Sequence, residues 1–234
     1  RLLISMSLPM MISMLVQALY NIVDSIFVSR VSENALTAVS MAFPIQSLMI
    51  AVGVGTSVGI NALLSRSLGE KEYERANKVA ENGIFLAGVS YVLFLFIGIF
   101  VTEPFFKSQT GIKEILDYGV AYLRICCCAS FGIFFQCTLE RLLQSTGKTL
   151  FTMVTQGLGA VINLILDPIL IFGYFGLPAM GVAGAALATV IGQVIAAILA
   201  LYFNLKYNGE IKLAIKGFRP SIPIIGMIYR VGLP

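Results

Sequence analysis

The sequence predicts an all-α membrane protein, folded as a bundle of six transmembrane helices. Hydrophobic residues make up 58% of the 234 residues and charged residues only 12%, whereas soluble domains carry roughly 25% charged residues. The mean hydropathy is +0.90. Six apolar segments also reach the length of about 20 helical residues that spans a bilayer core. These features argue against a soluble globular domain.

The six segments are separated by connections that contain Gly, Pro or clustered charge. The second connection carries the run LGEKEYERANK, which is too polar to lie in lipid. The fourth contains Gly147, and the fifth contains Gly176 and Pro178, which favour turns. The predicted spans are residues 3–29, 38–64, 79–102, 116–143, 149–173 and 180–205.

The Lys and Arg residues predict the orientation of these spans, because cytoplasmic loops are enriched in them. With the N-terminus in the cytoplasm, the outer side holds Arg30, Lys107 and Lys113, and Arg124 lies inside the fourth span. We therefore expect a multi-pass protein of the cytoplasmic membrane with a cytoplasmic N-terminus. The cytoplasmic side holds Arg1, Arg66, Lys71, Arg75, Lys78, Arg141, Lys148, Lys206, Lys212, Lys216, Arg219 and Arg230.

The composition argues against several other classes of protein. The formal net charge of +4 is small, so nothing favours a nucleic-acid partner. The chain contains no His, and its four Cys residues, at 126–128 and 137, lack the CxxC spacing of a metal or redox site. No nucleophile–base pair or phosphate-binding loop is visible. We expect neither enzyme activity nor a cofactor.

A short repeat indicates that the bundle is one lobe of two. Ser7-Leu8-Pro9 near the start is matched by Gly232-Leu233-Pro234, which follows six spans and a basic stretch at 206–219. Twelve-helix transporters built from two parallel repeats have this layout. We expect residues 1–220 to form the N-terminal six-helix lobe and residues 221–234 to begin the second lobe. The missing C-terminal lobe would then be the partner of this one.

Two carboxylates, Asp24 and Asp167, lie in the first and fifth spans, which are otherwise nearly free of charge. A carboxylate at the centre of a bilayer costs roughly 2.5–3.5 kcal/mol on insertion scales. Both acids lie about 18–19 residues from the cytoplasmic ends of their spans, so their depths agree within ~2 Å at the helical rise per residue. No Lys or Arg is predicted at that depth. A proton, a cation or a partner must therefore neutralise them.

Polar residues accompany both acids at helical spacing. Asn163 and Asp167 are four residues apart and share one helix face. Thr189 in the sixth span is expected at a comparable depth, with Gln193 one turn further along. Their oxygens are hard ligands, which suit Na⁺ or a shared proton rather than a soft transition metal. For Asn163 and Thr189, simple hydrogen bonding between helices is the alternative.

The first span carries a polar stripe and an early proline. Gln17, Tyr20, Asn21 and Asp24 recur at spacings of three and four residues, so they face one side of the helix. Pro9 lacks a backbone N–H and permits a bend in a membrane helix.

Glu140 in the fourth span has two interpretations. It lies near the predicted cytoplasmic end, next to Arg141 and at four-residue spacing from Gln136 and Gln144. One interpretation is an interfacial ion pair with Arg141. The other is a cytoplasmic gate or a substrate contact.

Two long stretches resemble the multidrug and toxic-compound extrusion (MATE) transporters. Residues 8–45 resemble their first span and following loop. Residues 142–193 resemble their fourth-to-sixth-span signature, with a small-Gly-Lys-Thr turn, Asn-x-x-x-Asp-Pro and Gly-Ala-Ala-x-Ala-Thr. The resemblance covers nearly the whole chain, and it looks closest to the bacterial branch typified by the DNA-damage-inducible F protein.

The resemblance implies a twelve-span protein that exports small organic cations across the lipid bilayer in exchange for Na⁺ or H⁺. It implies a cation site, the Na⁺ candidate, at Asp24, Asn163, Asp167 and Thr189. It also implies a bend at Pro9 and a substrate cavity lined by Gln17 and Tyr20. We expect Asn21 and Gln193 to line the same cavity.

Three other functions are weighed against cation-coupled export. Flippases of lipid-linked precursors and polysaccharide exporters share the superfamily architecture, but the paired acids and Asn-x-x-x-Asp-Pro argue against them. A non-transporting receptor or a channel subunit is the third. A channel would carry a ring of charges or a filter loop, and neither is visible in the sequence.

Overall fold

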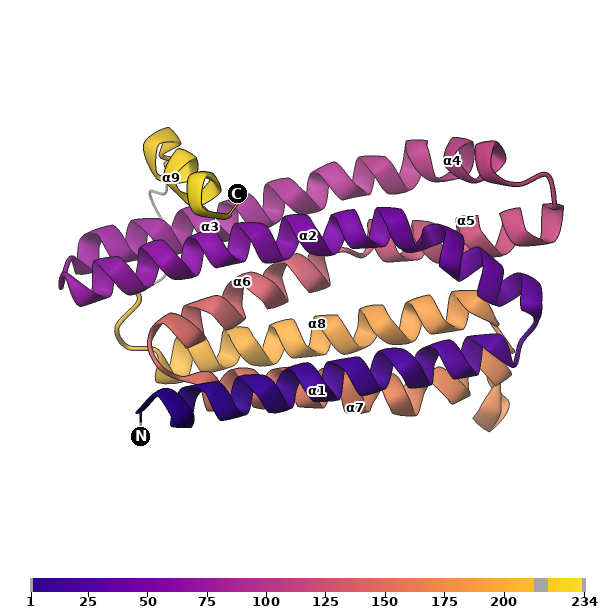
Figure 1. Ribbon diagram of the computed structural model, residues 1–234, viewed down its shortest axis with the longest axis horizontal. Coiled ribbons are helices and arrows are strands. Elements are labelled where there is room, and N and C mark those ends of the chain that lie inside the picture. The colour runs from indigo at the N-terminus through magenta and orange to yellow at the C-terminus, as the bar shows by residue number, and fades with distance from the viewer. Residues whose placement is uncertain (1, 213–218, 233–234) are drawn as a thin grey trace.

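The computed structural model describes residues 2–212 and 219–232, which form long helices that run side by side along one axis (Figure 1). Arg1, Lys216, Leu233 and Pro234, used above in the charge and repeat arguments, lie outside the described residues. The helices are α1 (Leu2–Ser29), α2 (Glu33–Gly69), α3 (Tyr73–Phe96), α4 (Thr102–Gln109), α5 (Lys113–Cys128), α6 (Phe131–Ser145), α7 (Thr149–Phe172), α8 (Val182–Tyr207) and α9 (Ile222–Gly232).

The predicted six-span bundle is confirmed. Five helical stretches are long and apolar enough to cross a membrane, and the pair α5 and α6 supplies a sixth when it is counted as one span. The third span runs longer than predicted, because a π-helical segment, Ile97–Val101, joins α3 to α4. The fourth span is bent by 43° where α5 ends and α6 begins.

The polar connections gather at the two ends of the bundle. Figure 1 shows the α2–α3 turn, the α6–α7 turn, the start of α1 and the end of α8 at one end. The α1–α2, α4–α5 and α7–α8 connections lie at the other end. The end with the α2–α3 turn carries Lys71, Arg75 and Lys148, so the structure places the predicted cytoplasmic charges together.

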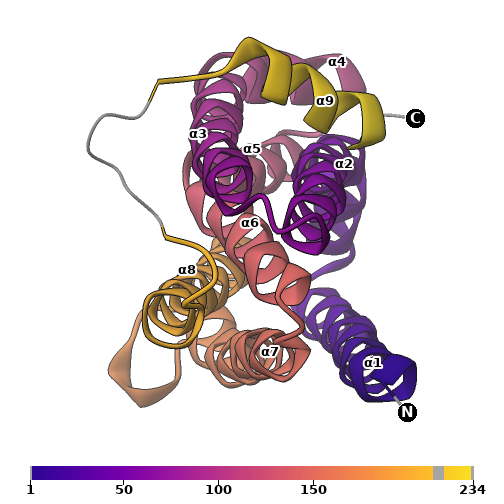
Figure 2. The ribbon, with the colours of Figure 1, turned by 90° about the vertical axis from the view of Figure 1, so that its left-hand side faces the viewer.

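Helix α6 lies at the centre of the bundle, as Figure 2 shows in end-on view. It packs against α2 and α3 on one side and against α8 on the other. Its buried side chains include Phe134, Leu139, Leu142 and Leu143. Helix α1 lies at the rim, where it packs mainly on α7.

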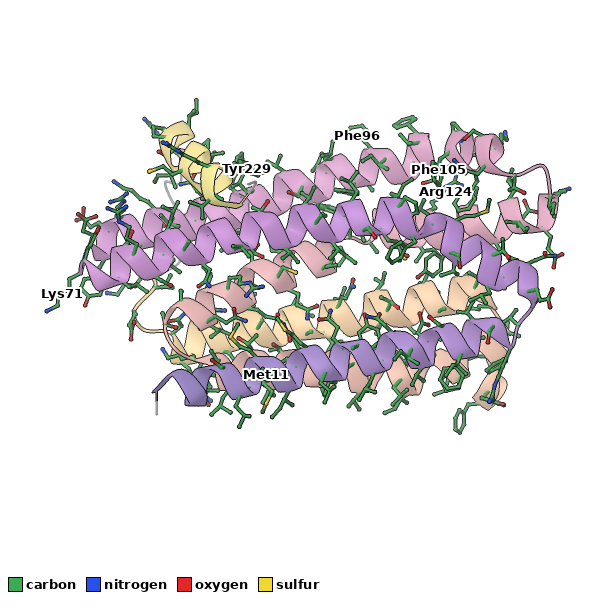
Figure 3. The ribbon with its side chains drawn as sticks, in the orientation of Figure 1. Met11, Lys71, Phe96, Phe105, Arg124 and Tyr229 are labelled. Atoms are coloured by element: carbon green, nitrogen blue, oxygen red, sulfur yellow. The ribbon has the colours of Figure 1, made fainter. Side chains whose placement is uncertain are left out.

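The outward faces of the bundle are apolar. Met11 on α1 and Phe96 on α3 are 66% and 57% exposed, and both point away from neighbouring helices (Figure 3). Leu15, Leu19 and Ile22 extend the same exposed face along α1. In water this surface would be a large unfavourable patch, whereas in a bilayer it contacts acyl chains.

Helices α7 and α8 approach closely because glycine lies at their contact. A Cβ built at Gly184 would lie 2.6 Å from the carbonyl carbon and oxygen of Leu170. A Cβ at Gly192 would lie 2.8 Å from the Gly159 oxygen. Since membrane helices associate through van der Waals packing, small residues at the contact allow backbones to meet. This approach sets the position of the polar residues of α7 relative to those of α8.

The π-helical segment lies against the break between α5 and α6. A Cβ at Gly98 would be 2.8 Å from Cys127 Cβ and 3.1 Å from Cys128 Sγ. Beyond it, the ring of Phe106 covers Gly119, where a Cβ would overlap the ring. Cys126 and Cys127 are buried free thiols.

Helix α9 crosses α2 at the end of the described chain (Figure 2). Its backbone contacts Gly55 and Gly59 of α2 through Gly232 and Ile228, with no room for a Cβ at either α2 position. Ile224 and Ile228 are buried in the core cluster that also holds Ile60 and Leu64. The assignment of residues 221–234 to a second lobe stays a prediction.

Candidate functional site

The buried acid of α7 is the centre of the candidate site. The Asp167 side chain is completely buried, at 0% exposure, on a helix that packs against both α1 and α8. Asn163, one turn earlier, is also buried, at 3%. The apolar run around them makes α7 a membrane helix, and their four-residue spacing places both side chains on one face.

Asn163 connects Asp167 to α8. In the amide orientation that satisfies both neighbours, the nitrogen donates to Asp167 Oδ2 at 3.0 Å. The amide oxygen then accepts from the Thr189 hydroxyl at 3.1 Å and from the Thr189 backbone N–H at 3.0 Å. The opposite orientation would leave a bond of 3.5 Å to Asp167 Oδ1, and its amide oxygen would face another acceptor. Orientation is inferred from hydrogen bonding, and the first arrangement is the better paired.

Asp24 lies on α1, which packs against α7. Its Oδ1 atom is buried and has no hydrogen-bond partner among the residues that the structure describes. Asp24 and Asp167 lie within range of each other's charge. No Lys or Arg nitrogen of the described chain lies within 4.0 Å of either carboxylate. Within the described residues, neither acid has a basic partner.

A polar cavity of about 200 Å³ opens beside this group, between α1, α2, α6, α7 and α8. The four residues predicted to line a substrate cavity all line it: Gln17, Tyr20, Asn21 and Gln193. Asn163 and Thr189 also contribute to its wall, whereas Asp24 and Asp167 do not. Asn163 therefore faces both Asp167 and the cavity.

Three residues near Asp24 were not predicted. Gln46 on α2 donates to the Tyr122 hydroxyl of α5 at 3.0 Å, and its amide nitrogen lies 3.9 Å from Cys126 Sγ. Tyr122 is only 4% exposed and lies within electrostatic range of Asp24. No helical spacing relates these residues to Asp24, because they come from other helices. Only tertiary packing brings them to the site.

Pro9 lies inside α1, which continues as one helix from Leu2 to Ser29. The Ser13 hydroxyl donates to the Pro9 carbonyl at 2.9 Å. The bend assigned to Pro9 therefore remains a prediction about a different conformation of α1.

The structure excludes one of the two interpretations of Glu140. Its carboxylate is 4% exposed and accepts hydrogen bonds from Gln136 and Gln156, at 3.0 and 2.7 Å. The neighbouring Arg141 donates instead to Gln144, at 2.6 Å. An interfacial ion pair between Glu140 and Arg141 is thus wrong, because Glu140 points into the bundle toward α7. Glu140 lines the polar cavity.

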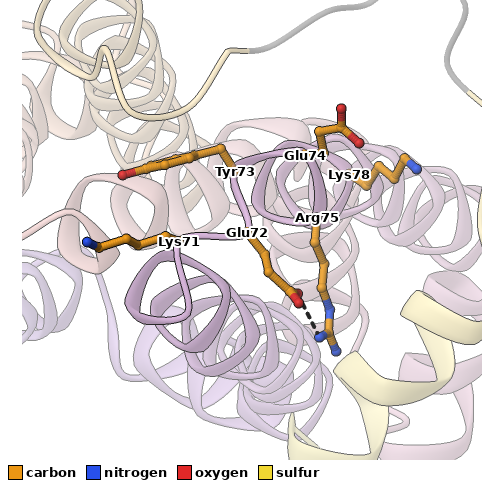
Figure 4. A pocket seen from close by; sticks show the side chains of 6 residues that line it. All are labelled: Lys71, Glu72, Tyr73, Glu74, Arg75 and Lys78. Carbon is orange, nitrogen blue, oxygen red and sulfur yellow. Dashed lines mark hydrogen bonds and ion pairs between the residues drawn. The ribbon is translucent and has the colours of Figure 1, made fainter.

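A second hollow, of about 510 Å³, lies at the α2–α3 turn (Figure 4). It is lined only by consecutive charged residues and Tyr73, and Glu72 pairs with Arg75 at 3.1 Å. Side chains of a single exposed turn form it, without convergence of separate elements. None of the predicted site residues lies there, so the cavity between α1 and α7 is the better candidate site despite its smaller volume.

The ligand chemistry of the buried group suits a hard monovalent cation or a proton. The two carboxylates and the Thr189 hydroxyl present oxygen atoms, the Asn163 amide connects Asp167 to Thr189, and Asp24 Oδ1 has no partner in the described chain. Oxygen donors of this kind suit alkali and alkaline-earth cations rather than soft metals. Among the described residues, no group of three or more His, Cys, Asp or Glu residues could hold a metal ion.

A membrane-spanning helical bundle has here a polar cavity beside a buried and a half-buried acid that lack a basic partner in the described chain, and this is the architecture of one lobe of a membrane transporter. The sequence pattern of the MatE family matches residues 9–169. The chain therefore belongs to the MATE family, as the sequence resemblance predicted.

Curated relatives and solved structures agree with this assignment. The chain is 29% identical over 229 residues to multidrug export protein MepA of Staphylococcus saprophyticus, covering 97% of this chain and 50% of that protein. It is 31% identical over 233 residues to MepA of Staphylococcus haemolyticus, with the same coverage. A multidrug resistance MATE transporter in an outward-facing conformation superposes with a TM-score of 0.90, at 31% identity, over 100% of this chain and 51% of that one.

The chain spans about half the length of the curated relatives it matches. Half is the length expected for one six-helix lobe of a twelve-helix protein. These relatives are MepA proteins, so placement in the branch of the DNA-damage-inducible F protein stays a prediction.

Proposed function

We propose that the full-length protein exports organic cations through the cytoplasmic membrane, driven by inward movement of Na⁺ or H⁺. Its N-terminus lies in the cytoplasm, and its second lobe completes the substrate path. The relatives are named as multidrug exporters, which supports a transporter rather than a catalyst. The gathering of Lys and Arg at one end of the bundle supports the orientation.

One observation carries this proposal: Asp167, buried on α7, and Asp24, half-buried on α1, have no basic partner among the residues that the structure describes. An ionised carboxylate buried alone is strongly unfavourable. Asp24 Oδ1 in particular has no hydrogen bond within the described chain. A bound cation or proton supplies positive charge at the acids. When it leaves, the free-energy cost of the ionised carboxylates returns. The energetic difference between the two states is what a coupled transporter needs.

Each surrounding residue has a role in coupling. Asp24 and Asp167 hold the ion, the Asn163 amide nitrogen orients Asp167, and Thr189 orients the Asn163 amide. Asn163 also faces the cavity, so it relates ion occupancy to cavity shape. Binding of one Na⁺ or H⁺ removes one of the two negative charges of the acid pair, and this change allows α1 to bend at Pro9. A bent α1 moves Gln17, Tyr20 and Asn21, which releases the organic cation outward.

The test is ethidium efflux from cells that express the full-length protein. Efflux is measured at fixed pH with and without an inward Na⁺ gradient, and then at fixed Na⁺ with and without an inward proton gradient. We expect efflux to stop when the coupling gradient is removed and to persist when the other is removed. Equal efflux without either gradient would contradict ion coupling. A vector-only strain controls for other exporters.

A further inference from the structure

We propose that Glu140 binds the positively charged group of the organic substrate at the inner end of the lobe cavity. This inference rests on the proposed function, since it concerns the substrate of the same transporter. It assigns to the cavity an anionic contact that is separate from the Asp24–Asp167 site.

The arrangement around Glu140 is that of a hydrogen-bonded carboxylate. Gln136 Nε2 donates to Oε1 at 3.0 Å, and Gln156 Nε2 donates to Oε2 at 2.7 Å. The Thr155 hydroxyl lies 2.9 Å from Oε1 and also 2.9 Å from the Thr152 carbonyl. A carboxylate offers about four acceptor positions. These contacts fix the group and leave at least one position for a ligand.

No cation of the described chain pairs with Glu140. Lys and Arg nitrogens within the described ranges all lie beyond 4.0 Å of its carboxylate. Arg141 also lines the cavity, but its guanidinium donates to the Gln144 oxygen at 2.6 Å. The negative charge is therefore held in place by neutral donors. Arg141 lies within range of the Glu140 charge without forming an ion pair with it. A cationic ligand at the open acceptor position would still be attracted to the carboxylate in a region of low dielectric constant.

The cavity next to Glu140 suits an amphipathic cation. Gln136, Gln156 and Glu140 form a polar part of its wall, whereas Ile50, Val54 and Ile133 form an apolar part. Ligand cavities typically combine a largely apolar lining with a few placed polar groups. An aromatic ring would contact the apolar part while its charged nitrogen lies near Glu140.

The Glu140 contact is distinct from the ion site. Thr155, which touches Glu140, and Asp167 are twelve residues apart on α7, which corresponds to about 18 Å along the helix. Glu140 lies close to the end of α6, at the end of the bundle that holds the α2–α3 turn. A substrate could thus be recognised at the inner end while the ion occupies the outer one.

The test measures ethidium binding to the purified full-length protein by fluorescence anisotropy, without an ion gradient. Ethidium carries a fixed charge, so its own protonation does not vary. We expect Glu140→Gln to raise the Kd for ethidium at least about tenfold, the effect of losing one charged contact. The matched control is Glu70→Gln, which removes an exposed acid paired with Arg66 at the α2–α3 turn and should leave the Kd unchanged.

Alkylation of Cys137 in the unaltered protein provides a second measurement that does not depend on the folding of a variant. Cys137 lines the same cavity. Ethidium should slow its reaction with a small maleimide, as followed by mass spectrometry of the labelled peptide. Absence of protection, or equal Kd values for Glu140→Gln and the unaltered protein, would overturn the assignment of Glu140. If the unaltered protein neither binds nor exports ethidium, the proposed function itself fails.

Discussion

Asp167 and Asp24 differ in how their carboxylate oxygens are surrounded. Asp167 is fully enclosed, and its environment supplies an amide donor from Asn163. Asp24 is less enclosed but has an oxygen atom with no partner in the described chain. A structural carboxylate would be expected to have all its buried oxygens paired. The unsatisfied oxygen of Asp24 therefore favours a functional group that gains its partner during a transport cycle.

We predict that Asp24→Asn or Asp167→Asn in the full-length protein abolishes resistance to ethidium. The amide has nearly the same shape but carries no negative charge and does not titrate, so the coupling step is lost. Resistance should fall to that of cells with empty vector, while the amount of protein in the membrane stays the same. The measurement is the minimal inhibitory concentration in an efflux-deficient bacterial host.

The control for these variants is Glu114→Gln, an exposed acid that accepts a hydrogen bond from Asn34 at the end of the bundle with the α1–α2 and α4–α5 connections. It should preserve resistance. Full resistance in either aspartate variant would show that the site is assigned wrongly.

At the scale of elements, close packing of α7 on α8 positions the site. Thr189 meets Asn163 because Gly184 and Gly192 allow α8 to approach the α7 backbone. Small residues are the usual means of such approach in membranes, where lipid offers no hydrophobic drive between helices. The chemistry of the site thus depends on glycines that do not take part in it.

We predict that Gly184→Ala destabilises the protein by about 1–3 kcal/mol, the usual cost of overpacking. The new Cβ would lie 2.6 Å from the Leu170 backbone, which cannot move without shifting α7. The measurement is the thermal unfolding midpoint in detergent. Gly88→Ala is the matched control, because a Cβ there meets nothing within 4 Å. An equal midpoint for both variants would contradict the packing argument.

The sequence predicts the helices well where hydropathy and length alone determine them. The fifth and sixth spans were expected at 149–173 and 180–205 and are found at Thr149–Phe172 and Val182–Tyr207. The π-helical segment and the break after Cys128 were not predicted, because no proline or charge marks either position in an apolar run. Backbone irregularities of this kind depend on packing between spans.

The residues of the candidate site were likewise predicted only in part. The polar stripe of α1 and the pair Asn163 and Asp167 follow from helical spacing within one segment. The burial of Glu140 does not, because its donors Thr155 and Gln156 belong to α7. A neighbouring arginine in the sequence suggested an ion pair, but α6 turns the two side chains to different partners.

At the scale of the whole molecule, the cavity is bounded by one lobe only. Gln17 and Asn21 line the cavity and are nevertheless exposed at the rim of the bundle. The chain covers about half of its relatives. The exposed side of the cavity wall is where a second lobe would close it.

We predict that this 234-residue chain alone does not transport. One lobe cannot alternate access around a cavity that it only half encloses. The measurement is ethidium movement across proteoliposomes that contain this chain, compared with proteoliposomes that contain the full-length protein. Gradient-driven movement with the single lobe would show that the two-lobe argument is wrong.

The irregular segment Ile97–Val101 and the α5–α6 junction lie at the same level of the bundle, as the contact of Gly98 with Cys127 indicates. Between that level and the α4–α5 connection, the Phe106 ring of α4 packs over Gly119 of α5. Two adjacent spans are thus interrupted at the same level and packed together beyond it. Because of this packing, a tilt of one span beyond the interruption would move the same part of its neighbour.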